Sequence, residues 1–184
     1  MTQDFAAKYR SKVDITEKFL HEELVQKHIG ASGLDVKVFL VGDSQRELYQ
    51  GGWGATRVTN GTGHIFMFER ALTLSDEGYF GYLASSVGYV LAVADMVKMV
   101  PVKQVDIVLQ QFSVQEVRMA LGDSLAADYF GVDVVPSRVE MYKSTAKSDV
   151  IPFNFLKYLA NLEKLSPETA RRIRKQTVQS KWIE

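Results

Sequence analysis

Residues 75–101 read SDEGYFGYLASSVGYVLAVADMVKMVP, with no charged side chain between Gly78 and Ala94. Apolar residues recur here at alternating steps of three and four, the spacing of one helix face: Phe80, Leu83, Val87, Val90, Ala94 and Val97. A second row with the same spacing has only small side chains: Gly81, Ser85, Gly88 and Ala92. We therefore predict a helix buried in the middle of the domain, with a stripe that lets another backbone approach closely.

The ends of this helix are marked in the sequence. Ser75 can cap its start, and Asp76 and Glu77 follow where the helix dipole favours negative charge. Pro101 ends the helix at Val100, because the residue before a proline avoids the helical region. The uncharged run is short for a membrane span, which needs about 20 apolar residues. We therefore expect no membrane span.

Composition places the chain among ordinary globular proteins. It has 184 residues, of which 46% are hydrophobic and 24% are charged, and we expect one domain, 1–184. Lys plus Arg equals Asp plus Glu at 22 each, which argues against binding nucleic acid through the whole surface. The chain has no cysteine, which excludes disulfides and a cysteine nucleophile and fits a cytoplasmic location.

The residues before the central helix predict a helix followed by a sheet. Residues 4–29 have a helical pattern, in one or two pieces with Gly30 as the stop, and Leu34–Val41 is rich in β-branched residues, as strands are. The pair Asn60-Gly61 predicts a type I′ hairpin between Ala55–Thr59 and Thr62–Leu72. Residues 42–44 and 47–50 are expected to form a turn and a short returning strand.

Alternation along the second hairpin arm places large apolar groups on both faces of the sheet. Ile65, Met67 and Ala71 share one face, whereas Phe66 and Phe68 share the other. We infer that the sheet is covered on both sides, or that a partner covers one side.

The residues after Pro101 predict mainly helices. Residues 102–112 fit a strand or a helix, and we favour the strand because the run is short and β-branched. A capping box, Ser113 with Glu116, begins a helix that ends at Gly131. Further predictions are a strand at 132–135, a mobile polar loop at 137–148, and helices at 153–165 and 168–179. The fold class predicted is α+β: an N-terminal helix, an antiparallel hairpin or meander packed on the long apolar helix, and a helical C-terminal part.

Candidate catalytic groups are few. His21 and His28 are seven residues apart on a helix, whereas helical metal pairs use a spacing of three or four, so we expect neither a metal nor a cofactor. His64 is the weak candidate for a general base, with Arg57 or Arg70 as the anion-binding group. The glycine-rich run 51–63 matches no nucleotide-binding motif.

Two sets of residues are candidates for binding. The first consists of aromatic residues that could contact a protein partner: Trp53, Phe66, Phe68 and Tyr79. The second is a basic helix within 166–184 that could contact an acidic partner through Arg171, Arg172, Arg174 and Lys175.

Three functional classes follow from these patterns. We favour a non-catalytic binding or adaptor protein that contacts another protein or itself as a homo-oligomer, because no catalytic constellation has suitable spacing. The first alternative is a small enzyme with a site assembled around His64 and Arg57 or Arg70. The second is a nucleic-acid accessory protein that uses the basic C-terminal helix, and nucleic acid is the less favoured partner.

Overall fold

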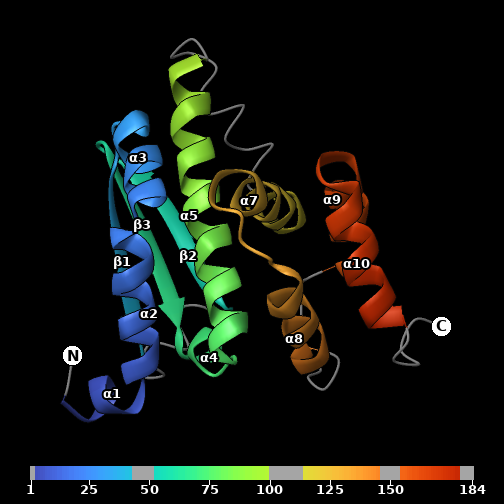
Figure 1. Ribbon diagram of the computed structural model, residues 1–184, viewed down its shortest axis with the longest axis horizontal. Coiled ribbons are helices and arrows are strands. Elements are labelled where there is room, and N and C mark those ends of the chain that lie inside the picture. Colours follow the sequence, from blue (N-terminus) through green and yellow to red (C-terminus); the bar gives the residue numbers. More distant parts are fainter. Residues whose placement is uncertain (1–2, 43–51, 100–113, 146–153, 179–184) are drawn as a thin grey trace.

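The elements of the chain are arranged around one long helix (Figure 1), in a computed structural model that describes residues 3–42, 52–99, 114–145 and 154–178. The strands are β1 (Asp35–Val41), β2 (Gly54–Thr59) and β3 (Thr62–Phe68). The helices of the first half are α1 (Gln3–Lys8), α2 (Arg10–His21), α3 (Glu23–Ser32), α4 (Glu69–Leu72) and α5 (Asp76–Met99). The second half contributes α7 (Gln115–Phe130), α8 (Val135–Thr145), α9 (Phe155–Leu165) and α10 (Pro167–Val178). The α+β fold is confirmed, including the long apolar helix and the helical C-terminal part.

Three helices precede the sheet where the sequence predicts one or two. The backbone is extended at Glu22, which separates α2 from α3. Gly33, in the left-handed conformation with φ 67°, ends α3, and Gly30 lies inside that helix instead of ending it. Phe19 of α2 is fully buried, and its ring packs edge-on against Phe80 of α5 at 5.4 Å between centroids.

The sheet has the strand order β1-β3-β2. The predicted hairpin between β2 and β3 is present, and Asn60 (φ 49°) and Gly61 (φ 74°) have the positive φ angles of a type I′ turn. β1 pairs with β3 in parallel, so the expectation of a purely antiparallel sheet is wrong. Alternation within a strand determines which side chains lie on each face of the sheet. It carries no information about the direction of the neighbouring strand, so the parallel pairing could not be predicted from it.

The second hairpin arm is shorter than predicted. β3 ends at Phe68, and the next four residues form the short helix α4. Ala71 and Leu72 are buried by that helical turn instead of by a continuing strand.

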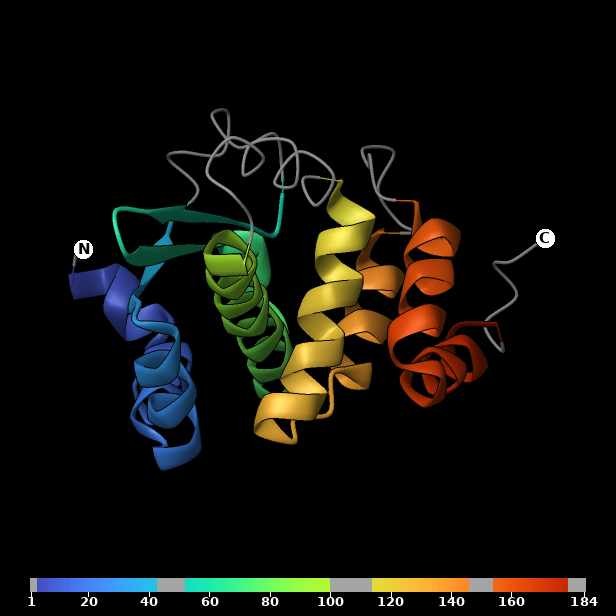
Figure 2. The ribbon, with the colours of Figure 1, turned by 90° about the horizontal axis from the view of Figure 1, so that it is seen from above.

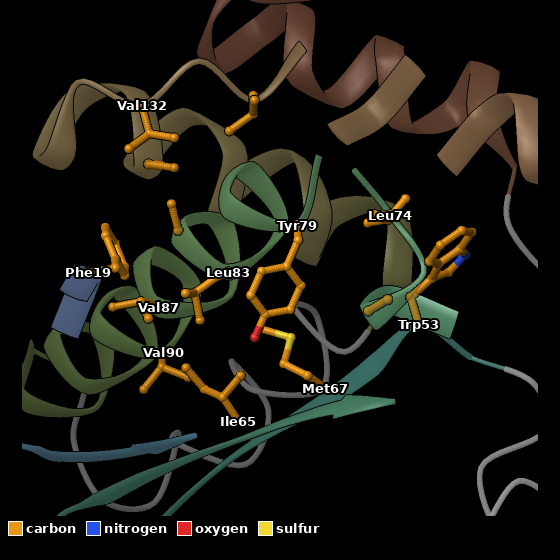
Figure 3. Packing of buried hydrophobic residues seen from close by; sticks show 14 of the residues in the cluster. Phe19, Trp53, Ile65, Met67, Leu74, Tyr79, Leu83, Val87, Val90 and Val132 are labelled. Carbon is orange, nitrogen blue, oxygen red and sulfur yellow. The ribbon is translucent and has the colours of Figure 1, made fainter. Parts of the chain in front are cut away.

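The inner face of the sheet packs on α5. Ile65 and Met67 of β3 are fully buried and point toward Tyr79, Leu83 and Val90 (Figure 3). Gly63 permits this contact, because a Cβ at position 63 would overlap a methyl group of Val90. One hydrophobic core therefore lies between the sheet, the N-terminal helices and α5, and a second lies among α7, α8, α9 and α10.

The small-residue stripe of α5 contacts α7 and the start of α8. A Cβ on Gly122 of α7 would overlap the carbonyl oxygen of Ser85. A Cβ on Gly88 would lie 3.1 Å from the Gly122 carbonyl oxygen, and one on Gly81 would lie 3.0 Å from the Ser137 Cβ. The two helix backbones thus lie as close as the sequence pattern predicts.

The C-terminal part corrects two predictions. Residues 132–135 were expected to form a strand and 137–148 a loop, but Val135–Thr145 is the helix α8. The polar residues of this segment predicted an exposed loop, but Ser137 and Arg138 are buried inside the fold. In α9, Leu159 and Leu162 are buried, whereas Leu156 is 62% exposed.

Some predictions concern residues outside the described ranges. They are the strand at 47–50, the segment 102–112, the cap at Ser113 and the last part of the turn at 42–44. These stay predictions.

α5 is the one helix within the described residues that is long and apolar enough to cross a membrane by length and composition. Of its most apolar window, 61% is buried inside the fold, as in the core helix of a globular domain. The described residues therefore give no clear membrane span. Figure 2 shows that the described helices around the sheet, α2, α3 and α5, lie on one side of it.

Candidate functional site

Three of the four aromatic residues predicted to contact a partner lie inside the fold. The Tyr79 side chain is fully buried, and its hydroxyl shares a 2.7 Å hydrogen bond with the Thr16 hydroxyl. Trp53 is 8% exposed, and the guanidinium carbon of Arg70 lies 4.4 Å from its ring centroid. Phe68 is also 8% exposed, whereas Phe66 is half-buried. Of this set, Phe66 is the residue with accessible surface in the folded chain.

The predicted catalytic group is only partly assembled. His64 and Arg57 are direct cross-strand partners on β3 and β2. Arg70 lies on α4 beyond the end of β3 and stacks on Trp53, so strand alternation does not place it beside His64. The Nδ1 atom of His64 is buried and has no hydrogen-bond partner in the part of the chain that the structure describes. A catalytic role of His64 stays a prediction.

The side chains that point away from α5 define a second face of the sheet. Lys37 of β1 lies opposite His64 of β3, which lies opposite Arg57 of β2. One step along, Phe39 lies opposite Phe66. Because Ile65 and Met67 between them point inward, these side chains point outward. We call this set the outer face: Lys37, Phe39, Arg57, His64 and Phe66.

Three rings form an array on the outer face. The Phe39 and Phe66 ring centroids are 5.1 Å apart, and the Phe39 and His64 centroids are 6.0 Å apart. The ring planes in both pairs are within 17° of parallel. Phe39 is 40% exposed, and neither phenylalanine packs against the described hydrophobic cores. The sequence could not identify Phe39, because its neighbours Val38 and Leu40 are apolar too.

Two cations flank this array. Arg57 is exposed, and Lys37 is also exposed, with its Nζ atom 3.1 Å from a carboxylate oxygen of Asp35. An exposed ion pair of this kind contributes about 0–1 kcal/mol, so Lys37 can exchange Asp35 for another anion at small cost. The outer face therefore combines flat apolar rings with two accessible positive charges.

The basic residues of α10 are less available than the sequence suggests. Arg171 pairs with Glu168 at 3.0 Å, Arg172 with Asp133 at 2.6 Å, and Arg174 with Glu163 at 3.1 Å. Lys175 is exposed. Because acids on the chain neutralise these arginines, the positive charge that α10 offers to an acidic partner is reduced. Binding of an acidic partner there stays a prediction.

A buried ionic cluster joins four helices in the C-terminal half, and the sequence did not predict it. Arg138 of α8 donates from Nε to Asp123 of α7 at 2.7 Å, and a second guanidinium nitrogen also binds this carboxylate. The same nitrogen donates to the Ser85 hydroxyl of α5 at 2.8 Å. Tyr158 of α9 donates from its hydroxyl to Asp123 at 2.6 Å. Asp123 is 0% exposed and Arg138 is 1% exposed.

The electrostatics keep Arg138 charged and Tyr158 protonated. Burial opposes the charge of Arg138, but the Asp123 carboxylate raises the pKa of the guanidinium above its ordinary value, so Arg138 stays charged. Burial, and then the negative charge of Asp123, raise the pKa of Tyr158 well above 10, so its hydroxyl stays a donor. Arg138, Asp123, Ser85 and Tyr158 each take part in at least one hydrogen bond of the cluster, and the Arg138 and Asp123 side chains are closed to solvent. The cluster can fix α5, α7, α8 and α9 relative to one another.

The described residues contain no group of three or more His, Asp or Glu side chains placed to hold a metal ion. The ring of His28 is stacked on Tyr129 at 4.4 Å, and His21 Nδ1 is 2.7 Å from the Glu17 carbonyl oxygen.

Comparison with protein-family models, with curated proteins and with solved structures finds no match for this chain. The outer face and the ionic cluster are therefore interpreted from their own geometry.

We predict that Asp123→Asn lowers the free energy of unfolding by about 3–5 kcal/mol, because it leaves Arg138 charged, buried and without its counter-ion. Asp128→Asn, on the exposed side of the same helix, should change it by less than about 0.5 kcal/mol. Urea unfolding followed by circular dichroism measures both values. Equal effects of the two substitutions would show that the cluster contributes little to stability.

We also predict a loss of stability in alkali. Burial raises the pKa of Tyr79 from 10.0 to about 12, so between these values the folded chain keeps a proton that the unfolded chain has lost. The stabilisation contributed by protonated Tyr79 is therefore fully present below pH 10 and is lost as the pH rises toward 12. Unfolding free energies measured from pH 9 to 11.5 should fall less steeply in Tyr79→Phe than in the wild type. Parallel slopes would contradict the assignment.

Proposed function

We propose that this protein is a non-catalytic binding protein and that the outer face of the sheet is its contact surface. The observation that carries the proposal is Phe39, a large apolar ring that is 40% exposed and stacked on a second half-buried ring, Phe66. Full burial of a phenylalanine stabilises by about 1.5–3 kcal/mol relative to full exposure, and the exposed part of Phe39 gives up a share of this. Contact with a partner restores it.

The position of the outer face supports the same proposal. The described helices beside the sheet lie on its inner side (Figure 2), and Phe39 on the outer face is 40% exposed. Large apolar side chains on both faces of a strand are typical of a sheet with two covered faces. The exposed ring alone does not decide whether the partner is a second copy of the chain or a different molecule.

The buried ionic cluster of Asp123 and Arg138 is not a candidate active site. A catalytic acid or base must reach the proton that it transfers. Asp123 and Arg138 are closed to solvent and already bound to each other, so they are positioned to stabilise the fold. An enzyme built around His64 and Arg57 is the alternative, and loss of turnover in His64→Ala would support it.

The test is native mass spectrometry of the protein purified from its own cells. Three forms are compared: the wild type, Phe39→Ser, and the control Leu156→Ser. Leu156 is 62% exposed on α9, so the control removes a comparable exposed apolar side chain away from the sheet.

We predict an additional bound mass, a second copy or another molecule, on the wild type and on Leu156→Ser. Phe39→Ser should lose that mass, because a serine removes the exposed ring. A bare chain in all three samples, or a bound mass that survives in Phe39→Ser, would contradict the proposal.

A further inference from the structure

We infer that the partner of the outer face is single-stranded nucleic acid. This inference rests on the proposed function and names the ligand of the same surface. It follows from two properties that the outer face combines: nearly parallel aromatic rings and flanking cations.

The rings fit flat, uncharged ligand groups. Phe39 and Phe66 lie 5.1 Å apart with planes 17° from parallel, and the His64 ring continues the array at 6.0 Å from Phe39. Phe39, the ring common to both pairs, is 40% exposed, and an unpaired base can stack on that exposed part. Single-stranded nucleic acid uses aromatic rings on sheet faces in this way, because every base has a flat π-surface.

The cations fit the phosphates between such bases. Lys37 and Arg57 are on the two strands that flank β3, so they lie on either side of His64. Consecutive phosphates of an extended strand can reach both. Asp35 is the acid beside Lys37, and its ion pair at 3.1 Å is exposed, so a phosphate can take its place.

Other occupants fit the charges less well. In a symmetric contact between two copies the same face meets itself, so the two cations Lys37 and Arg57 of one copy meet a face that carries the single acid Asp35. The excess of positive charge opposes that contact. Duplex nucleic acid offers phosphates, but its bases are stacked on each other and are not free to stack on Phe39.

α10 is the basic helix that the sequence predicts as a binding surface, and it lacks the aromatic rings. Its arginines are paired with Glu168, Asp133 and Glu163, and its exposed residues include no aromatic ring among 167–177. The outer face is therefore the better site for a strand of unpaired bases.

The experiment measures fluorescence anisotropy of a labelled 12-nucleotide single strand, as DNA and as RNA, with the matching duplex DNA as a comparison. The proteins are the full-length wild type, Phe39→Ser, Lys37→Gln and two controls. Leu156→Ser controls for loss of an exposed apolar group, and Arg171→Gln controls for loss of one positive charge elsewhere.

We expect the wild type to bind a single strand more tightly than the duplex. Phe39→Ser should weaken binding about tenfold, through the loss of one stacked base. Lys37→Gln should reduce the slope of log affinity against log salt by about 0.7, through the loss of one phosphate contact. Both controls should bind as the wild type does.

Three results would overturn the inference: no binding to either single strand, tighter binding to the duplex, or equal affinities of the wild type and Phe39→Ser. If the mass-spectrometric test still finds a second copy or another bound mass that depends on Phe39, the outer face remains a binding surface for a different partner. If both tests fail, the proposed function is wrong as well.

Discussion

The close approach of α5 and α7 is the constraint on which the rest of the structure depends. Two helix backbones come this near only where side chains are absent, and Gly88 and Gly122 leave that space. The approach brings Ser85 of α5 within reach of Arg138, which also binds Asp123 of α7. A wider separation would leave the Ser85 contact open to water or to a cavity. The ionic cluster, and with it the positions of α8 and α9, therefore depends on the two glycines.

The same helix divides the molecule into two parts with different chemistry. On one side, α5 packs its apolar residues against the inner face of the sheet (Figure 3). On the other side it contacts α7 and the buried polar cluster, which is satisfied and closed. The outer face of the sheet points away from both, with Phe39 exposed and its cations accessible. The buried contacts that stabilise this part of the fold thus surround α5. The surface that we assign to binding lies outside them.

The sequence predicted the features that depend on residues close together in the chain. The helical spacing in 75–100, the small-residue stripe and the Asn60-Gly61 turn are local patterns, and the structure contains the corresponding elements. Features that depend on distant pairs were missed. Arg138 is 15 residues from Asp123 and 53 from Ser85, so its polar sequence suggested a loop although its partners bury it in a helix.

The candidate site was predicted in part for the same reason. Alternation along β3 correctly indicated apolar groups on both faces of the sheet, and Phe66 belongs to the outer one. Phe39 has no local signal, because its neighbours along β1 are apolar and its face is decided by pairing with β3. Trp53 and Tyr79 are large aromatic residues, and residue type alone does not distinguish a surface ring from a core ring.

The most direct test of the central constraint is the free energy of unfolding of Gly122→Ala, measured by urea titration beside Gly30→Ala. Nothing lies within 4 Å of a Cβ at Gly30, which is exposed in α3, so alanine there should stabilise the chain by about 0.5–1 kcal/mol through helix propensity. At Gly122 the added methyl group overlaps the Ser85 carbonyl oxygen, and the account predicts a loss of about 1–3 kcal/mol despite the same gain in propensity. A stabilisation at both positions would show that α5 and α7 are not in close contact and would contradict the account.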